Sequence, residues 1–380
     1  PVYGSAGIVG THSAASVGEP AVIIGRKGTA GAVHLAEGPS WPIDTTYFIV
    51  PPHGVSARFL FYQLRFLKLQ KLDSSTAIPS LRREDLEAQW LVLAPIAEQE
   101  RIVAAIEEEF SRIDAGLAAL EKAQARLEAL NRRLLEDTIR SWWLRGHAKR
   151  LCEVAAIGTG STPLRSRGDY WTGGDIPWIT SGLVNLPTIE QAGEFVTPRA
   201  LEDHRLRLWP AGTLLIAMYG EGRTRGKCSE LAFSATCNQA CAAIVLHPEF
   251  AYLRPLVRLF FEYNYATTRR LASGGVQPNL NLTIVGQLEI PVPDARTVES
   301  ATKVLLSARN ALRRVSDEGA RLRLRALSMR STILRAAFSG RLASQDPRDE
   351  PAYALLERSR IKRVPSTGRK GARTTVNEGG

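Results

Sequence analysis

A heptad repeat between about Glu98 and Arg140 constrains this chain more than any other feature of its sequence. One apolar series recurs every seven residues, at Ile106, Ile113, Leu120, Leu127 and Leu134. A second series fills the other seam position, with Val103, Phe110, Leu117, Gln124, Asn131 and Thr138. The pattern continues for about five heptads without a proline, and it predicts a coiled-coil helix. At about 1.5 Å per residue this helix is roughly 60 Å long and needs a partner to bury its seam.

A second, less regular repeat from about Thr297 to Gly340 provides the expected partner. One series is Val298, Leu305, Leu312, Gly319, Ala326 and Ile333, and the other is Ala301, Ala308, Val315, Leu322 and Met329. The first helix carries an acidic cluster at Glu107, Glu108 and Glu109, whereas the second carries arginines from Arg309 to Arg335. Because unlike charges beside two seams favour mixed pairing, we expect an antiparallel helix pair. The alternative is two unrelated helices, each packed on its own domain.

The chain also matches itself with a period of about 195 residues, which indicates a tandem duplication. Val22–Val50 matches Ala217–Val245 without a gap. In this alignment Gly25, Thr29, Gly31 and Asp44 fall on Gly220, Thr224, Gly226 and Gln239. Ile78–Leu81 then matches Gln277–Leu280, and a heptad helix follows each time. Nothing in the first copy matches Leu151 to roughly Phe195, so we expect that copy to lack some tens of N-terminal residues.

The repeated unit is expected to be rich in β-strands. Short apolar runs between glycine-rich turns predict strands at 21–24, 46–50, 213–216 and 242–245, each pair followed by a helical patch. The predicted fold class is α+β, with two tandem β-rich modules, each followed by a long α-helix. We expect module 1 at 1–93, the first long helix at 94–142, module 2 at 143–292, the second long helix at 293–342, and a mostly disordered tail at 343–380. Within the tail, one short helix is expected at Ala352–Arg358.

Composition favours an anionic partner. The 380 residues carry a net charge of +11 and give a pI of about 9.7, a balance typical of proteins that bind nucleic acid or an anionic surface. No apolar run approaches the ~18 residues that a membrane span needs. The four cysteines show no CxxC spacing and have few histidines nearby, which argues against zinc. A reduced, cytosolic protein is the simplest interpretation.

Two glycine-rich basic loops at equivalent positions, Gly25–Thr29 and Tyr219–Lys227, are the main candidates for DNA contact. Glycines let a backbone approach its partner closely, and Arg and Lys suit phosphates or guanine edges. The second loop is not a phosphate-binding ATPase loop, because Glu221 stands where a glycine is required and Cys228 where Ser or Thr would bind magnesium. The alternative for both loops is a plain hairpin with a solvated basic tip.

Polar residues near these loops complete the candidate set. Asn and Gln can read adenine through two hydrogen bonds, although they also cap strand ends. The candidate DNA-binding residues are Tyr3, Ser5, Arg26, Lys27, Thr29, Asp44, Thr45, Thr46, Tyr47, Thr162, Arg165, Arg167, Tyr219, Glu221, Arg223, Arg225, Lys227, Asn238, Gln239, Gln277 and Asn279. The six histidines form no triad or metal cluster, and the sequence contains no paired nucleophile and base and no Asn/Asp-Pro-Pro-aromatic motif. We therefore expect no metal site and no catalysis.

With this organisation the chain resembles the specificity subunit of type I restriction–modification systems. The segments similar to recognition-domain patterns are Val2–Gly10, Ile24–Thr29, Asp44–Tyr47, Gly160–Pro163, Tyr170–Trp171 and Ile176–Ile179. Ala94–Val103 resembles the family's helix start, and Asp346–Arg363 resembles its C-terminal tail. The second helix start, Pro293–Arg296, departs from the pattern because it lacks the Glu-Gln pair.

The resemblance implies a non-catalytic subunit whose two modules each read one half of a split site on double-stranded DNA. It implies that the helix pair spaces the modules and binds two modification subunits, with restriction subunits joining the complex. S-adenosylmethionine, ATP and magnesium are then expected in those partner subunits and no cofactor in this chain. The alternative is a structural coiled-coil adaptor whose globular ends bind protein.

Overall fold

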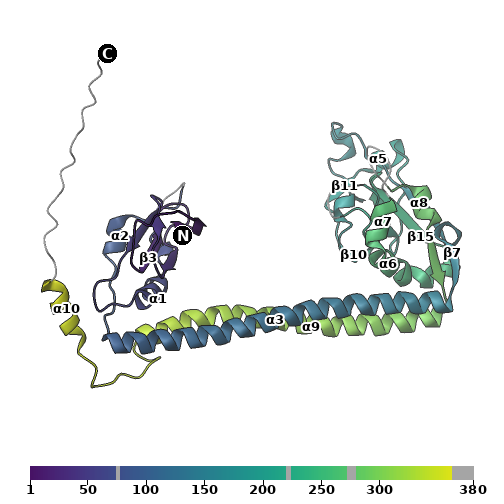
Figure 1. Cartoon of the computed structure of the whole chain (residues 1–380). Coiled ribbons are helices and arrows are strands. Elements are labelled where there is room, and N and C mark those ends of the chain that lie inside the picture. Colours follow the sequence, from purple (N-terminus) through teal and green to yellow (C-terminus); the bar gives the residue numbers. More distant parts are fainter. Residues whose placement is uncertain (74–77, 220–223, 272–279, 362–380) are drawn as a thin grey trace, which may run out of the picture. The chain divides into compact units, whose positions relative to one another are not determined.

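The computed structural model describes residues 1–73, 78–219, 224–271 and 280–361. Its contacts divide the chain into unit 1, residues 1–122 and 319–380, and unit 2, residues 123–318. Each unit contains one module and a part of both long helices, α3 (Ile96–Arg145) and α9 (Ala295–Phe338) (Figure 1). No helix in the described ranges is both long and apolar enough to cross a membrane.

Module 1 contains two three-stranded sheets, ordered β2-β1-β5 and β4-β3-β6. Its elements are β1 (Val2–Gly4), β2 (Gly7–Gly10), β3 (Ala21–Gly25), β4 (Val33–Ala36), β5 (Trp41–Pro42), β6 (Thr46–Ile49), α1 (Ala57–Leu67), the 3-10 turn η1 (Leu69–Leu72) and α2 (Arg83–Glu87). Ser56 caps α1, because its hydroxyl accepts the Phe59 N–H. The apolar face of α1, with Leu60 and Leu64, then packs on the fully buried strand β3.

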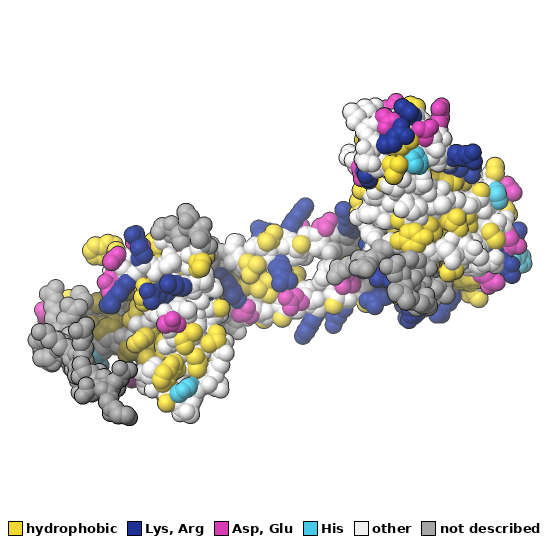
Figure 2. Space-filling view, turned by 90° about the horizontal axis from the view of Figure 1, so that it is seen from above, with side chains coloured by type: hydrophobic (Ala, Val, Ile, Leu, Met, Phe, Trp, Pro, Cys, Tyr) yellow, Lys and Arg dark blue, Asp and Glu magenta, His cyan; other side chains and the backbone are white. Residues whose placement is uncertain are grey.

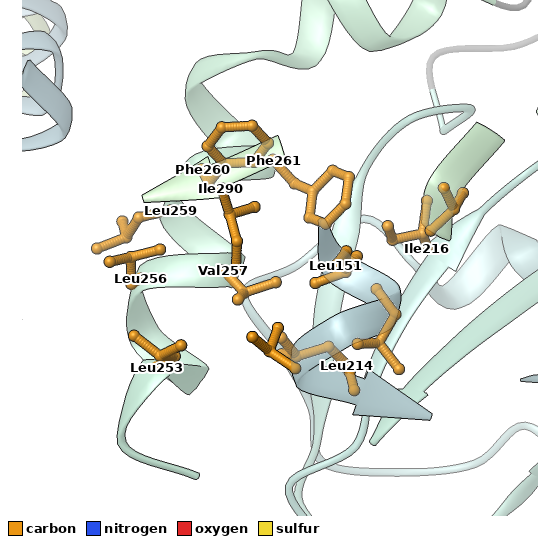
Figure 3. Close-up of a cluster of buried hydrophobic side chains, with 14 of the residues drawn as sticks. Leu151, Leu214, Ile216, Leu253, Leu256, Val257, Leu259, Phe260, Phe261 and Ile290 are labelled. Carbon is orange, nitrogen blue, oxygen red and sulfur yellow. The ribbon is translucent and has the colours of Figure 1, made fainter. Parts of the chain in front are cut away.

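Module 2 is a larger version of this arrangement. Its sheets are ordered β10-β13-β12-β15-β8, β11-β9-β14 and β16-β7. The strands are β7 (His147–Arg150), β8 (Ala155–Thr159), β9 (Ile176–Ile179), β10 (Thr188–Ile189), β11 (Glu194–Val196), β12 (Leu214–Ala217), β13 (Cys228–Leu231), β14 (Thr236–Cys237), β15 (Cys241–Leu246) and β16 (Glu289–Val292). The helices and 3-10 turns are α4 (Leu151–Val154), η2 (Gly168–Tyr170), η3 (Ser181–Leu183), α5 (Pro198–Asp203), η4 (Pro248–Leu253), α6 (Arg254–Tyr263), α7 (Tyr265–Leu271) and α8 (Leu282–Gln287). In the main core, the α6 side chains Val257 and Phe261 point toward Leu151 and Ile216 (Figure 3).

Strand pairing confirms the internal repeat and corrects its alignment. Val22 lies opposite Leu35 and Ile49, and Leu214 lies opposite Glu230 and Ile244 in the same antiparallel order. β3 therefore matches β12, and Gly25 corresponds to Ala217 rather than to Gly220. The gapless alignment is wrong here because the loop after β12, residues 218–227, is three residues longer than the loop after β3, residues 26–32. The insertion falls in a glycine-rich loop, where the sequence has no apolar pattern to fix the register.

The smaller sheets correct a second expectation. β1 runs parallel to β5 in module 1, as β9 runs parallel to β14 in module 2. β2 and β11 then pair antiparallel with β1 and β9. Val2–Gly10 is therefore the counterpart of the β9–β11 segment, and the expectation that nothing in module 1 matches Leu151 to Phe195 is wrong for that part.

The two long helices lie side by side within each unit, and their contacts revise the predicted seam. Every predicted seam position on α3 is buried or half-buried, as is the Val298 series on α9. In the second α9 series Ala301 and Ala308 are half-buried, but the prediction is wrong from Val315 onward, because Val315, Leu322 and Met329 are exposed by 57%, 41% and 53%. The polar positions one residue further on face α3 instead: Ser316 bonds Gln124 at 3.0 Å and Arg323 pairs with Glu121 at 3.3 Å. Apolar spacing alone could not reveal a seam position that polar side chains occupy.

The start of α9 has a cap of its own. Asp294 accepts hydrogen bonds from the backbone N–H and the hydroxyl of Thr297, at 2.9 and 2.8 Å. These bonds hold the pKa of the Asp294 carboxyl below its usual range. The missing Glu-Gln pair therefore does not leave this helix uncapped. In the tail, α10 spans Ala352–Ile361, slightly longer than predicted.

Candidate nucleic-acid interface

Backbone hydrogen bonds hold the loop after β3 against two other segments of module 1. The Arg26 N–H donates to Thr45 O at 2.8 Å, and the Leu81 N–H donates to Arg26 O at 2.9 Å. The Gly31 N–H closes the loop onto Gly25 O at 2.8 Å, with Gly31 at a φ of +75° that favours glycine. These bonds bring the predicted basic loop, the 44–47 segment and the repeated x-Pro-x-Leu segment together.

Six of the predicted residues share the surface that this loop creates, which we call the module 1 face. They are Ser5, Arg26, Lys27, Thr29, Asp44 and Thr45. Arg26 donates to Asp44 O at 3.4 Å, and its guanidinium lies 5.7 Å from the Tyr47 ring centroid. Arg26 and Lys27 are both exposed. Their positive charge therefore projects from a loop whose backbone is fixed.

Three predicted residues of module 1 have structural roles instead. Tyr3, Thr46 and Tyr47 donate their hydroxyls to the carbonyls of Leu35, Ile43 and Leu81, at 3.2, 2.7 and 3.2 Å. Tyr3 and Thr46 are buried, and burial raises the pKa of Tyr3. All three side chains support the backbone beneath the loop, and Tyr47, unlike the other two, is half-buried.

Module 2 repeats the same backbone arrangement with different side chains. The Met218 N–H donates to Ala240 O at 2.7 Å, and the Leu280 N–H donates to Met218 O at 3.3 Å. Met218 therefore takes the place of Arg26, but Met218 is buried in the main core whereas Arg26 is exposed. Half-buried Tyr219 packs on the main core, and Lys227 lines a hollow of about 550 Å³ beside Arg258. The predicted residues Glu221, Arg223, Gln277 and Asn279 lie outside the described residues, and Arg225 is half-buried.

The turn between β14 and β15 carries the two predicted amides. Gln239 is exposed, and its side-chain oxygen accepts the Thr162 hydroxyl at 2.6 Å. The Asn238 side-chain oxygen accepts the Ala240 N–H at 3.2 Å. Asn238 therefore caps the end of a strand, which is the alternative to base contact for this residue. Thr162 and Gln239, from segments far apart in sequence, therefore share one site.

Arg165 and Arg167 are engaged within the module. The Arg165 guanidinium lies 3.9 Å from the Trp171 ring centroid and 4.8 Å from that of Trp178, and it pairs with Glu194. Arg167 bonds Asp169 at 3.0 Å and the Tyr170 hydroxyl at 2.7 Å. The sequence predicted both arginines, but the Arg165 partner Glu194 could not be predicted because it is distant along the chain.

Motifs and spacing in the sequence do not reveal the side chains that attach each module to its long helix. In unit 1 the buried Gln99 accepts the Ser56 N–H at 2.8 Å and donates to the carbonyls of Gly54 and Ala94. Arg58 of α1 also pairs with Glu107 of α3 at 2.9 Å. In unit 2 the polarity is reversed, because Glu262 of α6 pairs with Arg309 of α9 at 2.8 Å. The expectation that Glu107 and Arg309 serve interhelical pairing is wrong, since both bind the modules.

Within the described ranges, no group of three or more His, Cys, Asp or Glu side chains is placed to hold a metal ion. The four cysteines are free, and burial raises the pKa of Cys228 to about 12.

Comparison with known proteins bears on the same two modules. A model of the type I restriction modification DNA specificity domain matches residues 1–128 and 147–301. The specificity subunit of the type I restriction enzyme MjaIX of Methanocaldococcus jannaschii is 27% identical over 167 residues, which are 41% of this chain and 36% of that protein. The chain thus aligns with little more than a third of that relative's length.

Two solved structures share the fold at less than 25% identity. The HsdS subunit of Thermoanaerobacter tengcongensis has a TM-score of 0.58 at 17% identity, covering 87% of this chain and 84% of that one. A chain from a study of complex assembly and conformational transition of the type I R-M system has a TM-score of 0.67 at 18% identity, covering 84% and 82%.

Proposed function

Because this chain belongs to the type I restriction modification DNA specificity family, we propose that it is the DNA-reading subunit of a type I restriction–modification complex. Each module then reads one half of a bipartite site on double-stranded DNA, and the chain itself catalyses nothing. The observation that carries this proposal is the matched loop, which the same backbone bonds hold in both modules. Around this common scaffold the exposed side chains differ, with Arg26 and Lys27 in module 1 and Gln239 in module 2, whereas Met218 at the Arg26 position is buried. One scaffold with different exposed side chains is what two independent readers need.

The proposed contact residues follow from exposure. In module 1 they are the exposed or half-exposed side chains of the module 1 face, with Tyr3, Thr46 and Tyr47 beneath them as support. In module 2 they are Gln239 and Asn238 in the turn, Thr162, which bonds Gln239, together with Arg225 and Lys227 and the four predicted residues outside the described ranges. Arg165 and Arg167 are proposed contacts as well, with each guanidinium binding a phosphate in addition to its internal carboxylate partner.

We also propose the domain division at 93, 142, 292 and 342, with α3 and α9 pairing as an antiparallel coiled coil. In unit 1 the pairs Glu121–Arg323 and Asp114–Arg330 support this pairing, because the α9 number rises as the α3 number falls. In unit 2 the burial of Leu135, Ile139, Val298 and Leu305 in one core supports it too.

The proposed partners are two modification subunits, which carry S-adenosylmethionine, and restriction subunits, which use ATP and magnesium. The exposed apolar side chains of α9 support a protein partner on these helices, since Val304 and Val315 in unit 2 and Leu322 and Met329 in unit 1 face away from α3. Figure 2 shows such apolar side chains among Lys and Arg on the helix surface. A surface of this mixed kind is typical of a subunit interface.

Duplex binding as a function of salt tests the proposal against a purely structural adaptor. A reader that neutralises several phosphates should lose affinity with a log–log slope of about −0.9 per phosphate. The measurement uses a fluorescent duplex that contains the methylated site of the complex. Affinity that is weak and insensitive to salt would favour the adaptor.

A further inference from the structure

A hollow in unit 2 lies between module 2 and the helix α9. Its volume is about 550 Å³, which falls within the range of small-molecule sites. One wall is the segment 185–187, a second is formed by α6 and the start of α7, and a third is α9 from Leu306 to Arg313. Lys227 and Cys228, at the start of β13, complete the lining.

Hydrogen bonds and an ion pair hold these walls in place. The Glu230 N–H donates to Pro187 O at 2.9 Å, which fixes the segment 185–187 on β13. Arg309 of α9 donates to both carboxylate oxygens of Glu262 in α6, at 3.1 and 2.8 Å. Contacts within the unit therefore shape the hollow in advance, as is usual for small-molecule sites.

Positive charge in the hollow exceeds negative charge by three. Its cationic lining residues are Lys227, Arg258, Arg309 and Arg313, and its carboxylate is that of Glu262, which Arg309 already binds. Lys227 and Arg258 are half-buried, and their side chains form no ion pair with a carboxylate in the described ranges. Because partly buried cations without a counterion are costly, an anion would be stabilised here.

The matched hollow of module 1 has no such excess. It is lined by β4, α1 and α3, and its Arg and Glu residues are Arg58, Arg65, Glu37 and Glu107. Arg58 pairs with both glutamates. The positive excess is therefore a property of unit 2 and not of the repeated fold.

The remaining lining of the unit 2 hollow suits a flat ring with polar edges. Leu306 is 40% exposed on α9, and Pro187 and Tyr265 also line the hollow. Asn185 and Asn310 are exposed on two of its walls. A side-chain amide both donates and accepts hydrogen bonds, so it can bind the edge of a base or the hydroxyls of a sugar.

We propose that this hollow binds a nucleoside phosphate that is free in solution. Arg258 and Lys227 bind the phosphate, and the base lies against Leu306 with its edge toward Asn310. Charge-assisted hydrogen bonds are roughly twice as strong as neutral ones, so the phosphate contributes most of the affinity. Of the cations in the hollow, only Lys227 belongs to the proposed DNA contacts, and Arg258 therefore distinguishes this site from the DNA-reading surface.

Calorimetric titration of the full chain with each of the four ribonucleoside 5′-monophosphates tests this site. We expect at least one of them to bind saturably, at one site per chain. The corresponding nucleoside lacks the phosphate and inorganic phosphate lacks the base, so each should bind at least about tenfold more weakly. No saturable binding by any of the four nucleotides, or equal binding by the nucleotide and its nucleoside, would overturn the proposal. These comparisons need no variant of the protein.

Two charge-matched variants locate the site. Arg258→Met removes the charge and keeps an unbranched apolar stem, so nucleotide binding should weaken at least about tenfold. Arg132→Met removes a positive charge from an exposed position on α3 in the same unit, and it should leave nucleotide binding within about twofold of the parent. Equal nucleotide binding by the two variants would overturn the assignment to this hollow.

Duplex binding by the same variants separates a free nucleotide from a strand of DNA. Arg258→Met should weaken duplex binding no more than Arg132→Met does, because Arg258 is outside the proposed DNA contacts. If Arg258→Met selectively lost duplex affinity, the hollow would hold a phosphate of DNA, and the proposal of a free nucleotide would be overturned.

Discussion

One buried side chain, Gln99, attaches module 1 to its long helix. Gln99 is fully buried and makes three hydrogen bonds to backbone groups on both sides of the junction. Buried polar groups are costly when they lose a partner, so this amide fixes the angle at which the helix leaves the module. The polarity reversal between Arg58–Glu107 and Glu262–Arg309 shows that the second junction is built from different residues.

Substitution of Gln99 tests this junction. Gln99→Ala leaves the Ser56 N–H and the Gly54 and Ala94 carbonyls without their partner, and it should lower the free energy of unfolding by about 2 kcal/mol. Urea denaturation measures the loss, and amide exchange at Ser56 should quicken. Gln191→Ala, at an exposed position in unit 2, should change stability by less than about 0.5 kcal/mol. Equal effects of the two variants would contradict a structural role for Gln99.

Arg26 and Lys27 are the residues whose loss should affect DNA binding most clearly. Each is exposed on a loop with a fixed backbone, so the double Ala variant should bind duplex more weakly and with a shallower salt dependence. Each lost phosphate contact reduces the slope by about 0.9. Arg112→Ala is the matched control, because Arg112 pairs with Glu108 and Glu109 on the helix surface. An unchanged slope in the double variant would remove the module 1 face from the interface.

At the scale of elements, the periodic parts of the chain were predictable and the registers were not. The α3 seam and the four predicted strands follow from apolar spacing, which directly reports which face of an element is buried. The α9 seam failed at Val315, Leu322 and Met329, where polar contacts with α3 decide the rotation of the helix. The predicted alignment of Gly25 with Gly220 is wrong, because three additional residues in the loop after β12 shift the register without changing the strand pattern. The candidate site was predicted as separate segments. The pairs Arg165–Glu194 and Thr162–Gln239 are brought together only by the fold.

The corrected α9 register predicts opposite outcomes at two similar residues. Leu305 is 1% exposed in the main core of unit 2, so Leu305→Ala should cost about 2–5 kcal/mol. Val315 is 57% exposed on the same helix, and Val315→Ala should cost less than about 0.5 kcal/mol. Denaturation of the isolated subunit measures both. If Val315 belongs instead to a surface for a modification subunit, its substitution should weaken assembly while leaving stability unchanged.

At the scale of the whole molecule, duplication is consistent with the proposed reading of two unlike half-sites by one chain. Both modules keep the same strand order and the same loop closures, so the scaffold is common to them. The exposed side chains around this scaffold differ, with Arg26 and Lys27 in module 1 and Gln239 in module 2, so the chemistry that each scaffold presents is its own. This arrangement makes each module an independent reader in the proposed complex.

Methylation mapping after a module exchange tests that central claim most directly. Residues 143–292 are replaced by the corresponding module of a specificity subunit whose DNA site is known, and the variant is expressed with its modification subunits. Sequencing of modified bases then gives the sites that the parent and the variant direct. The account predicts that one half of the bipartite site changes to that of the donor while the other half is retained. A change in both halves together, or methylation at the parental site, would contradict independent reading by the two modules.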